Sequence, residues 1–422
     1  MKTLTTVLLL SCGLAGDFPE PSALPVRAEL PDPLTTFEGK KIATREEWEK
    51  TRRPELKALF QHYMYGFLPP LTEVKAEVRR EDTAAFGGKA LLREVSLTIA
   101  GPKGPRLDLL LVVPAKRSGP APVFVGLNFS GNHTLVADPA VAIPTTWMRG
   151  GGGKDEAVVN NRATEKGRGK NIGTWALEQS VDRGYAVATV YYGDVFPDKP
   201  DFSEGVFPQF HTPKEGQKSP GDTACGAIAM WAWGIHRMID YLVTLPELDK
   251  SRIAVTGHSR LGKTALLAAA FDDRVALAIP HQAGCGGTGP SRSKNPKAES
   301  VKRINTSFPH WFDDHFKKFN DEMDKLPFDQ HCLLAICAPR PVLYTNGVED
   351  QWANPDGQFE MLKAAAPVYK LYGIDALATS ELPPVGKLVD STLGYYIRTG
   401  PHVSDPDYWK IFLDYADRHF KK

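Results

Sequence analysis

The apolar residues of this chain follow two patterns, one typical of strands and one typical of helices. Short apolar runs of strand length are separated by longer segments in which apolar residues recur at helical spacing. The predicted strands cover residues 91–99, 106–113, 122–128, 185–192, 252–256, 275–280, 341–346 and 395–398, and the clearest helices cover 175–182 and 224–244. Apolar strands that alternate with helices are typical of a parallel sheet covered on both faces. The pattern therefore predicts an α/β fold, with a mostly parallel central sheet in a three-layer sandwich.

Three segments of different character follow one another along the sequence. Residues 1–16 have the composition of a signal peptide, with Lys2 before a short apolar run and the small residues of Gly13-Leu14-Ala15 at a cleavage position. Residues 17–60 form a proline-rich arm that leads into a helix beginning near Arg45. We expect residues 61–422 to form a single α/β domain, with glycine-rich polar insertions near 131–173 and 194–221.

The leader decides where we expect the protein to act. Its apolar run, Leu4 to Leu10, is too short to span a bilayer, so the sequence favours a secreted or periplasmic protein with no membrane span. Leu9-Leu10-Ser11-Cys12 also resembles a lipoprotein cleavage box, and lipidation of Cys12 at the outer membrane is the alternative.

Charge and cysteine content exclude several classes of partner. The chain has 422 residues with 51 Lys and Arg against 50 Asp and Glu, a balance that argues against nucleic acid or an anionic membrane. Four cysteines remain beyond the leader, and their spacing matches no zinc site. One or two disulfides are possible in an exported protein. We expect a monomer that needs no metal or other cofactor.

A serine follows directly on one of the buried strands. The run Ile253-Ala254-Val255 leads into Gly257-His258-Ser259, and a small-residue helical segment begins immediately afterwards. A strand, a tight turn and a helix with serine at the apex make a nucleophile elbow, where the helix start offers free N–H groups to an oxyanion. The usual second glycine is absent, because Leu261 stands in its place and Gly262 comes one residue late.

A serine nucleophile needs a base and an orienting acid, which follow it in chain order in folds of this kind. His402 lies in the loop between the last predicted strand and the last helix, where the base is expected. The loop after the preceding strand contains Glu349 and Asp350. We predict that Asp350 is the acid, with Glu349 as the alternative.

The serine segment also has a recognisable signature. Gly257-His258-Ser259-Arg260-Leu261-Gly262-Lys263 resembles the Gly-Cys-Ser-Arg-x-Gly-Lys motif of carbohydrate esterase family 15, the glucuronoyl esterases. Residues 126–133 are similar to the family's loop beside the oxyanion hole, and residues 304–312 and 349–352 are similar to further family segments. These matches occur in the same order over most of the chain.

The resemblance implies an α/β-hydrolase fold and a serine esterase that cleaves the ester between glucuronic acid of glucuronoxylan and an alcohol of lignin. By position, Ser259 is the nucleophile, His402 the base and Arg260 the arginine that helps to hold the oxyanion. The resemblance further implies that the substrate sugar is held by Lys263, Glu299 and Trp352.

The chain departs from the fungal members at the acid. Those enzymes place it after the strand that follows the elbow, where this sequence has Gln282, which we group with the substrate-binding residues. An amide cannot stabilise an imidazolium ion as a carboxylate does, so the acid must be Asp350, as in some bacterial members.

Other interpretations stay open at this stage. The fold could carry an acetyl-xylan or other carbohydrate esterase. The amide at Gln282 favours a non-catalytic carbohydrate-binding protein, and a secreted peptidase is a further alternative. Cys285, between two glycines, is a rival nucleophile.

Overall fold

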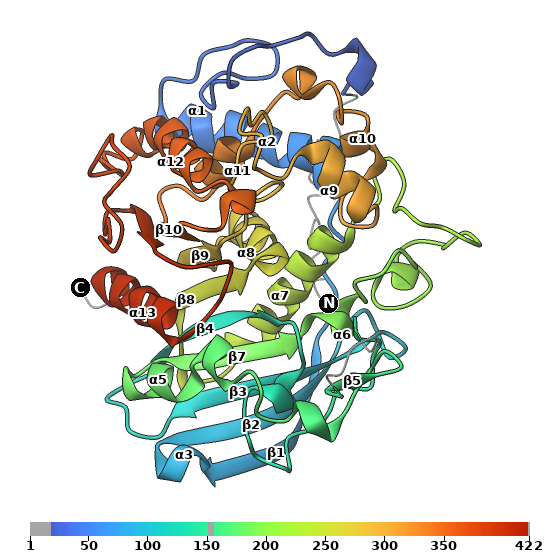
Figure 1. Cartoon of the computed structure of the whole chain (residues 1–422), viewed down its shortest axis with the longest axis vertical. Helices are drawn as coiled ribbons and strands as arrows, with labels where there is room; N and C mark the ends of the chain where they lie inside the picture. The colour runs from blue at the N-terminus through green and yellow to red at the C-terminus, as the bar shows by residue number, and fades with distance from the viewer. Residues whose placement is uncertain (1–17, 151–155, 421–422) are drawn as a thin grey trace, which may run out of the picture.

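The computed structural model describes residues 18–150 and 156–420, so the predicted leader and Cys12 lie outside the described residues. A nine-stranded sheet runs through the molecule in the order β1-β2-β3-β7-β4-β8-β9-β10-β11 (Figure 1). Its strands are β1 (Lys75–Ala84), β2 (Ala90–Thr98), β3 (Arg106–Pro114), β4 (Ala121–Asn128), β7 (Ala186–Tyr191), β8 (Leu248–His258), β9 (Leu277–His281), β10 (Val342–Gly347) and β11 (Leu393–Arg398). The strands from β7 to β11 are parallel, and β1, β2 and β3 form an antiparallel edge. The prediction of a mostly parallel sheet is confirmed.

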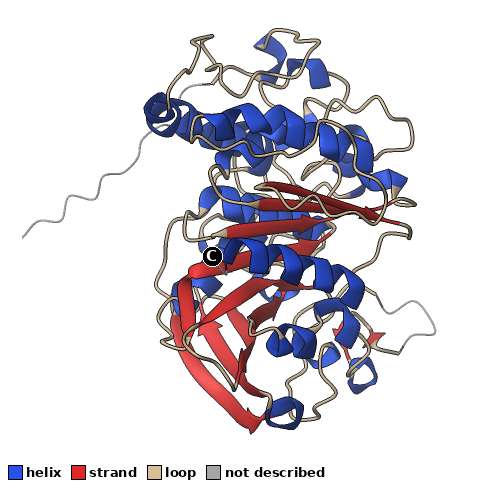
Figure 2. Cartoon of the chain, turned by 90° about the vertical axis from the view of Figure 1, so that its left-hand side faces the viewer, coloured by secondary structure: helices blue, strands red, loops and turns tan. Residues whose placement is uncertain are grey.

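Helices cover both faces of the sheet (Figure 2). The helices are α1 (Arg45–Glu47), α2 (Arg53–Phe60), α3 (Ala85–Gly88), α4 (Ile172–Trp175), α5 (Leu177–Asp182), α6 (Tyr192–Val195), α7 (Ala227–Leu242), α8 (Arg260–Phe271), α9 (Val301–Ser307), α10 (Asp314–Lys317), α11 (Gln330–Ile336), α12 (Pro355–Lys370) and α13 (Pro406–Phe420). One apolar core joins α2, α7, α8, α11 and α12 to one face. A second core joins α5 and α13 to the other face. The parallel strands are therefore buried on both sides, which explains their continuous apolar runs.

The proline-rich arm belongs to the larger of these cores. Leu24, Ile42 and Trp48 are buried in the same cluster as α7 and α8. The first helix begins at Arg45, as expected, because the Thr44 hydroxyl accepts a hydrogen bond from the backbone N–H of Glu47. The arm and the α/β segment thus share one hydrophobic interior.

Two local features differ from the pattern-based prediction. Strand β1 was not predicted, because most of its residues are polar and exposed at the sheet edge, and none is buried. The helix expected over residues 175–182 is two short helices, since Ala176 has a left-handed backbone (φ 42°) that ends α4 and starts α5.

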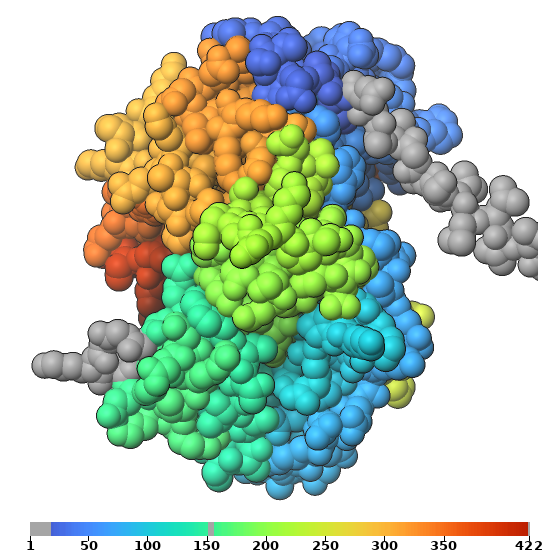
Figure 3. All heavy atoms as spheres, turned by 90° about the vertical axis from the view of Figure 1, so that its right-hand side faces the viewer, coloured from blue at the N-terminus to red at the C-terminus, as the bar shows by residue number. Residues whose placement is uncertain are grey.

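The two predicted insertions lie at the rim of the sheet. Segment 131–173 contains a small hairpin of β5 (Val158–Val159) and β6 (Arg162–Ala163), and segment 194–221 is mostly irregular. Figure 3 shows their described parts, teal to green and lime, side by side on one face. Over the described residues, no helix combines the length and apolarity needed to cross a bilayer.

Candidate active site

Ser259 occupies the turn between β8 and α8. Its backbone has φ 59° and ψ −123°, a conformation that an L-residue adopts only when its surroundings enforce it. The turn is tight because a Cβ atom on Gly257 would lie 2.2 Å from the carbonyl oxygen of Leu261. A Cβ atom on Gly262 would lie 2.8 Å from the carbonyl oxygen of His281. The second glycine is therefore needed where helix α8 approaches β9, and Leu261 is free to pack in the core.

His402 and Asp350 meet above the carboxyl ends of neighbouring strands. His402 follows β11 and Asp350 follows β10, and His402 Nδ1 lies 2.6 Å from Asp350 Oδ2. The Asp350 carboxylate is buried, and its other oxygen accepts a hydrogen bond from the Ala353 backbone N–H. Glu349 is exposed to solvent. Because a carboxylate only accepts, Nδ1 carries the proton, and Nε2 is left as the basic nitrogen of His402.

Gln282 holds the backbone on both sides of His402. Its Oε1 accepts a hydrogen bond from the Val403 N–H (3.0 Å), and its Nε2 donates to the Pro401 carbonyl oxygen (3.2 Å). Oε1 also lies 2.9 Å from His258 Nε2. Gln282 is 1% exposed, and these protein groups occupy its amide.

Three histidine rings stack beneath the site. The ring of His258 lies 4.3 Å from that of His402 and 5.0 Å from that of His281, centroid to centroid. Burial lowers the pKa of His281 to about 4. Burial, together with the neighbouring histidines, holds the pKa of His258 well below its ordinary value. Both of these buried rings therefore stay neutral at pH 7.

Arg260 is fixed by Asp198, a residue that the sequence did not single out. Arg260 Nη1 donates to the fully buried carboxylate of Asp198, which also accepts hydrogen bonds from His310 Nε2 and Trp311 Nε1, both at 2.8 Å. Burial alone would raise the pKa of Asp198, but the His310 hydrogen bond and the Arg260 charge hold it below its ordinary value. The guanidinium also lies over the Trp311 ring, 4.7 Å from its centroid. Asp198 therefore fixes the orientation of the Arg260 guanidinium.

A cavity of about 510 Å³ opens beside Ser259. Its lining brings together all eight predicted site residues and adds Arg303, Phe308 and Trp311. Glu299 and Trp352 are joined through the Glu299 N–H and the Trp352 carbonyl oxygen (3.0 Å), and Arg303 lies 5.1 Å from the centre of the half-exposed Trp352 ring. The cavity therefore offers charged groups and an aromatic edge next to the serine.

Two buried charges give this cavity its polarity. Lys263 Nζ donates to the carbonyl oxygens of Ala283 and Cys285, which leaves one of its three N–H groups for another partner. Burial lowers the pKa of Lys263. Burial also raises the pKa of Glu299, against the opposing effect of Lys263 and Arg260.

The rival nucleophile is poorly placed. Cys285 is buried, and burial raises the pKa of its thiol, so little thiolate forms. All four cysteines of the described residues are buried and free. In the part of the chain that the structure describes, no group of His, Cys, Asp and Glu side chains could hold a metal ion.

Sequence reasoning missed Asp198, His310 and Arg303 for different reasons. Asp198 lies in an irregular insertion beyond β7, where no periodic pattern marks its position. His310 and Trp311 lie within the segment 304–312 that resembles the family, and this was a signal that could have located them. Arg303 directly precedes that segment on α9.

The chain is similar to known carbohydrate esterases over most of its length. The family model for fungal glucuronyl esterase matches residues 219–373. The chain is 41% identical to carbohydrate esterase MZ0003 of an unknown prokaryotic organism, over 92% of this chain and 89% of that protein. It is 28% identical to 4-O-methyl-glucuronoyl methylesterase 1 of Wolfiporia cocos, over 82% of this chain and 72% of that enzyme.

Solved structures extend the likeness to three dimensions. A promiscuous CE15 esterase from a marine bacterial metagenome aligns with a TM-score of 0.85 at 40% identity, over 95% of this chain and 99% of the other. The glucuronoyl esterase of Solibacter usitatus also gives 0.85, at 35% identity, over 94% of this chain and 100% of the other. The chain therefore belongs to carbohydrate esterase family 15, the glucuronoyl esterases, and is a carboxylic ester hydrolase with an α/β-hydrolase fold.

Proposed function

We propose that this protein hydrolyses esters of glucuronic acid through an acyl-enzyme on Ser259. His402 Nε2 takes the proton of the Ser259 hydroxyl while Oγ attacks the ester carbonyl carbon. The resulting oxyanion is held by the backbone N–H of Arg260 and by its guanidinium, which Asp198 fixes in place. Asp350 stabilises the imidazolium that forms on His402.

The intermediate then collapses in the direction that releases the alcohol. The bond between the carbonyl carbon and the ester oxygen breaks, and His402 gives its proton to the departing oxygen. A water molecule next attacks the acyl-enzyme, with His402 accepting a proton from that water. The bond to Ser259 Oγ breaks, Oγ regains the proton, and glucuronic acid is released.

The observation that carries the choice of substrate is the charged cavity beside Ser259. Glu299 and the free N–H of Lys263 can hydrogen-bond sugar hydroxyls, and the exposed Trp352 can cover a sugar face. The names of the relatives, 4-O-methyl-glucuronoyl methylesterases, support a uronate in this cavity. We extend the proposal to the glucuronoxylan–lignin ester, in which the uronate is a branch of xylan and the alcohol belongs to lignin.

The deciding experiment compares two esters on the purified protein. Wild type should cleave benzyl glucuronate much faster than 4-nitrophenyl acetate, and Ser259→Ala should lose both activities. Cleavage of the acetate alone would support the serine mechanism but contradict glucuronate as the substrate, and it would favour an acetyl-xylan esterase. Cleavage of neither ester would favour the carbohydrate-binding interpretation.

We also propose that the protein is exported by its leader and released. The family relationship and the composition of residues 1–16 support this location. Expression of the full chain in a bacterial host should give a mature protein that starts near Asp17. A mass spectrum showing a lipidated Cys12 would instead assign the protein to the membrane surface.

A further inference from the structure

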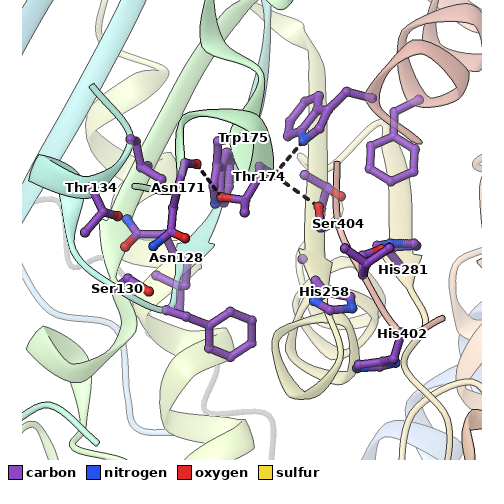
Figure 4. Close-up of a pocket in the computed structure, with 18 residues that line it drawn as sticks. Asn128, Ser130, Thr134, Asn171, Thr174, Trp175, His258, His281, His402 and Ser404 are labelled. Carbon is purple, nitrogen blue, oxygen red and sulfur yellow. Dashed lines mark hydrogen bonds between the residues drawn. The ribbon is translucent and has the colours of Figure 1, made fainter. Parts of the chain in front are cut away.

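His258 directly precedes the nucleophile, but its side chain does not line the cavity that contains Lys263 and Glu299. It lines a second cavity, of about 280 Å³, next to His281 and His402 (Figure 4). The steps of the proposed reaction do not use the His258 ring, although it stacks on the ring of the base. Such a side chain can act on the reaction only through the base that it contacts.

The Asp350 carboxylate fixes only one edge of the His402 ring. With Nδ1 held by this hydrogen bond, the ring can still tilt, and a tilt moves Nε2 away from the Ser259 hydroxyl. The ring of His258 restricts this motion on one face, at 4.3 Å between centroids and 35° between ring planes. The His402 side chain is 38% exposed, and a side chain so open to solvent depends on the few contacts that it has.

His258 is held from three directions, so it can serve as a fixed support. Its Nε2 donates to Gln282 Oε1 at 2.9 Å, because the carbonyl oxygen of an amide can only accept. The His281 ring lies against it at 5.0 Å, and the Phe129 ring meets it at 6.3 Å and 90°. His281 is anchored in turn by Thr345, whose hydroxyl lies 2.7 Å from its Nδ1.

The same contacts extend to the backbone next to His402. Gln282 Oε1 accepts from both His258 and the Val403 N–H, and His281 Nε2 donates to the Val403 carbonyl oxygen at 2.9 Å. His258 therefore contacts the base directly through its ring and supports its loop through Gln282. One group of contacts holds both the side chain and the backbone of the base.

A neutral ring suits a position beside a base that becomes positively charged. His402 takes up a proton when Ser259 attacks the ester, and a second charge on the stacked ring would repel the imidazolium. Burial, together with the neighbouring histidines, holds the pKa of His258 well below its ordinary value. The face of a neutral aromatic ring can also attract a cation.

We infer that His258 is a positioning residue of the ester hydrolysis, whose ring holds the His402 imidazole in line with the Ser259 hydroxyl. The inference rests on the proposed function, because it assigns another residue to the same reaction. Its mark in the sequence lies within the signature, where His258 stands in place of the cysteine of the family motif. The position before the nucleophile thus supplies an aromatic support for the base.

Two variants separate the ring of His258 from its hydrogen bond. His258→Phe keeps a ring and removes the donor, whereas His258→Asn keeps a polar amide and removes the ring. With methyl glucuronate as substrate, His258→Asn should lower kcat about ten- to hundredfold, and His258→Phe should stay within about threefold of wild type. KM should change less than about twofold in both, because His258 does not line the cavity proposed for the sugar.

The control accounts for any loss of folded protein. Labelling to completion with a serine-directed phosphonate counts the active sites, so that kcat refers to folded enzyme alone. His236 is another buried histidine, whose Nε2 lies 2.9 Å from the Ala268 carbonyl oxygen, and it lines neither cavity. His236→Ala should therefore leave kcat per active site unchanged.

Proton NMR gives a readout that does not depend on turnover. The Nδ1 proton of His402, in its 2.6 Å hydrogen bond to Asp350, should give a resonance at low field. This resonance should persist in His258→Phe. It should be broadened or lost in His258→Asn, because a tilting ring exposes the proton to exchange with water.

The outcomes separate this inference from the proposed function. Equal kcat in His258→Phe and His258→Asn, a change confined to KM, or an unaltered low-field resonance in His258→Asn would overturn the positioning role. Hydrolysis by wild type would still support the esterase in each of these cases. Failure of wild type to cleave any glucuronate ester would instead remove the proposed function itself.

Discussion

Replacing Gln282 by glutamate tests whether a carboxylate at position 282 could serve His402 as the acid in place of Asp350. The sequence resemblance aligns Gln282 with the position of the acid in fungal members, so a simple expectation is that Gln282→Glu restores a second acid. The contacts predict the opposite. Gln282 Nε2 donates to the Pro401 carbonyl oxygen and lies 3.5 Å from the Tyr408 hydroxyl. Tyr408 itself donates to the Asn346 carbonyl oxygen, so it presents a lone pair to Gln282.

A glutamate would therefore place a carboxylate oxygen against two buried acceptors, the Pro401 carbonyl oxygen and the Tyr408 hydroxyl oxygen. The lost hydrogen bond costs about 1 kcal/mol, and an unsatisfied buried acceptor costs a further 1–3 kcal/mol or so. With an unfolding entropy of about 2.1 cal/mol/K per residue over 422 residues, a loss of about 3 kcal/mol lowers Tm by roughly 3 °C. Gln282→Met removes the hydrogen bonds without adding charge and is the matched control.

The activity assay asks whether the new carboxylate can serve His402. Asp350→Asn should reduce kcat on benzyl glucuronate by about four orders of magnitude, because His402 loses the partner that fixes its tautomer. The double variant with Gln282→Glu should be no more active, since the contacts of residue 282 are to Pro401 and Val403 rather than to His402 Nδ1. Recovery of a hundredfold or more in the double variant would refute this reasoning.

Three further predictions follow from other parts of the site. Asp198→Asn breaks the buried charge pair with Arg260. It should lower kcat on benzyl glucuronate at least about tenfold with little change in KM, and it should lower the free energy of unfolding by about 3 kcal/mol. An unchanged kcat would show that Arg260 does not stabilise the oxyanion. Glu299→Gln should raise KM for glucuronate esters roughly tenfold while 4-nitrophenyl acetate hydrolysis stays constant, because only the sugar contact is weakened; equal effects on both esters would count against it. Because burial lowers the pKa of His281 to about 4, the unfolded chain binds the extra proton, and stability is lost as pH falls from about 6.5 towards 4. In urea denaturation, the free energy of unfolding should be about 2 kcal/mol lower at pH 5 than at pH 8. The His281→Gln variant should lack this part of the pH dependence.

Local patterns predicted the parts of the fold that bury continuous apolar surface. The strands that carry Ser259, Asp350 and His402 are buried on both faces, so their positions followed from the sequence. Strand β1 lies at the exposed edge and has no such pattern. The split between α4 and α5 depends on a left-handed residue, Ala176, that nothing in the local sequence marks.

Contacts between distant loops could not be predicted in the same way. Asp198 reaches Arg260 across 62 positions, and Gln282 reaches Val403 across 121. Each pairing depends on how the loops fold over the strand ends, and no spacing rule encodes it. The resemblance to a family marked Ser259 and Arg260 and aligned Gln282 with the position of an acid, but it gave no sign that the Gln282 amide would bond to the loop of His402.

The backbone of the serine turn limits how this enzyme can be made more stable. Ser259 (φ 59°) holds a positive φ angle, at a cost of order 1–3 kcal/mol. Glycine would adopt this angle freely, so a selection for heat resistance alone would reward glycine at the position that carries the reactive hydroxyl. Thermostable variants should therefore be sought with Ser259 held constant, since the stabilised glycine variant would lack the nucleophile.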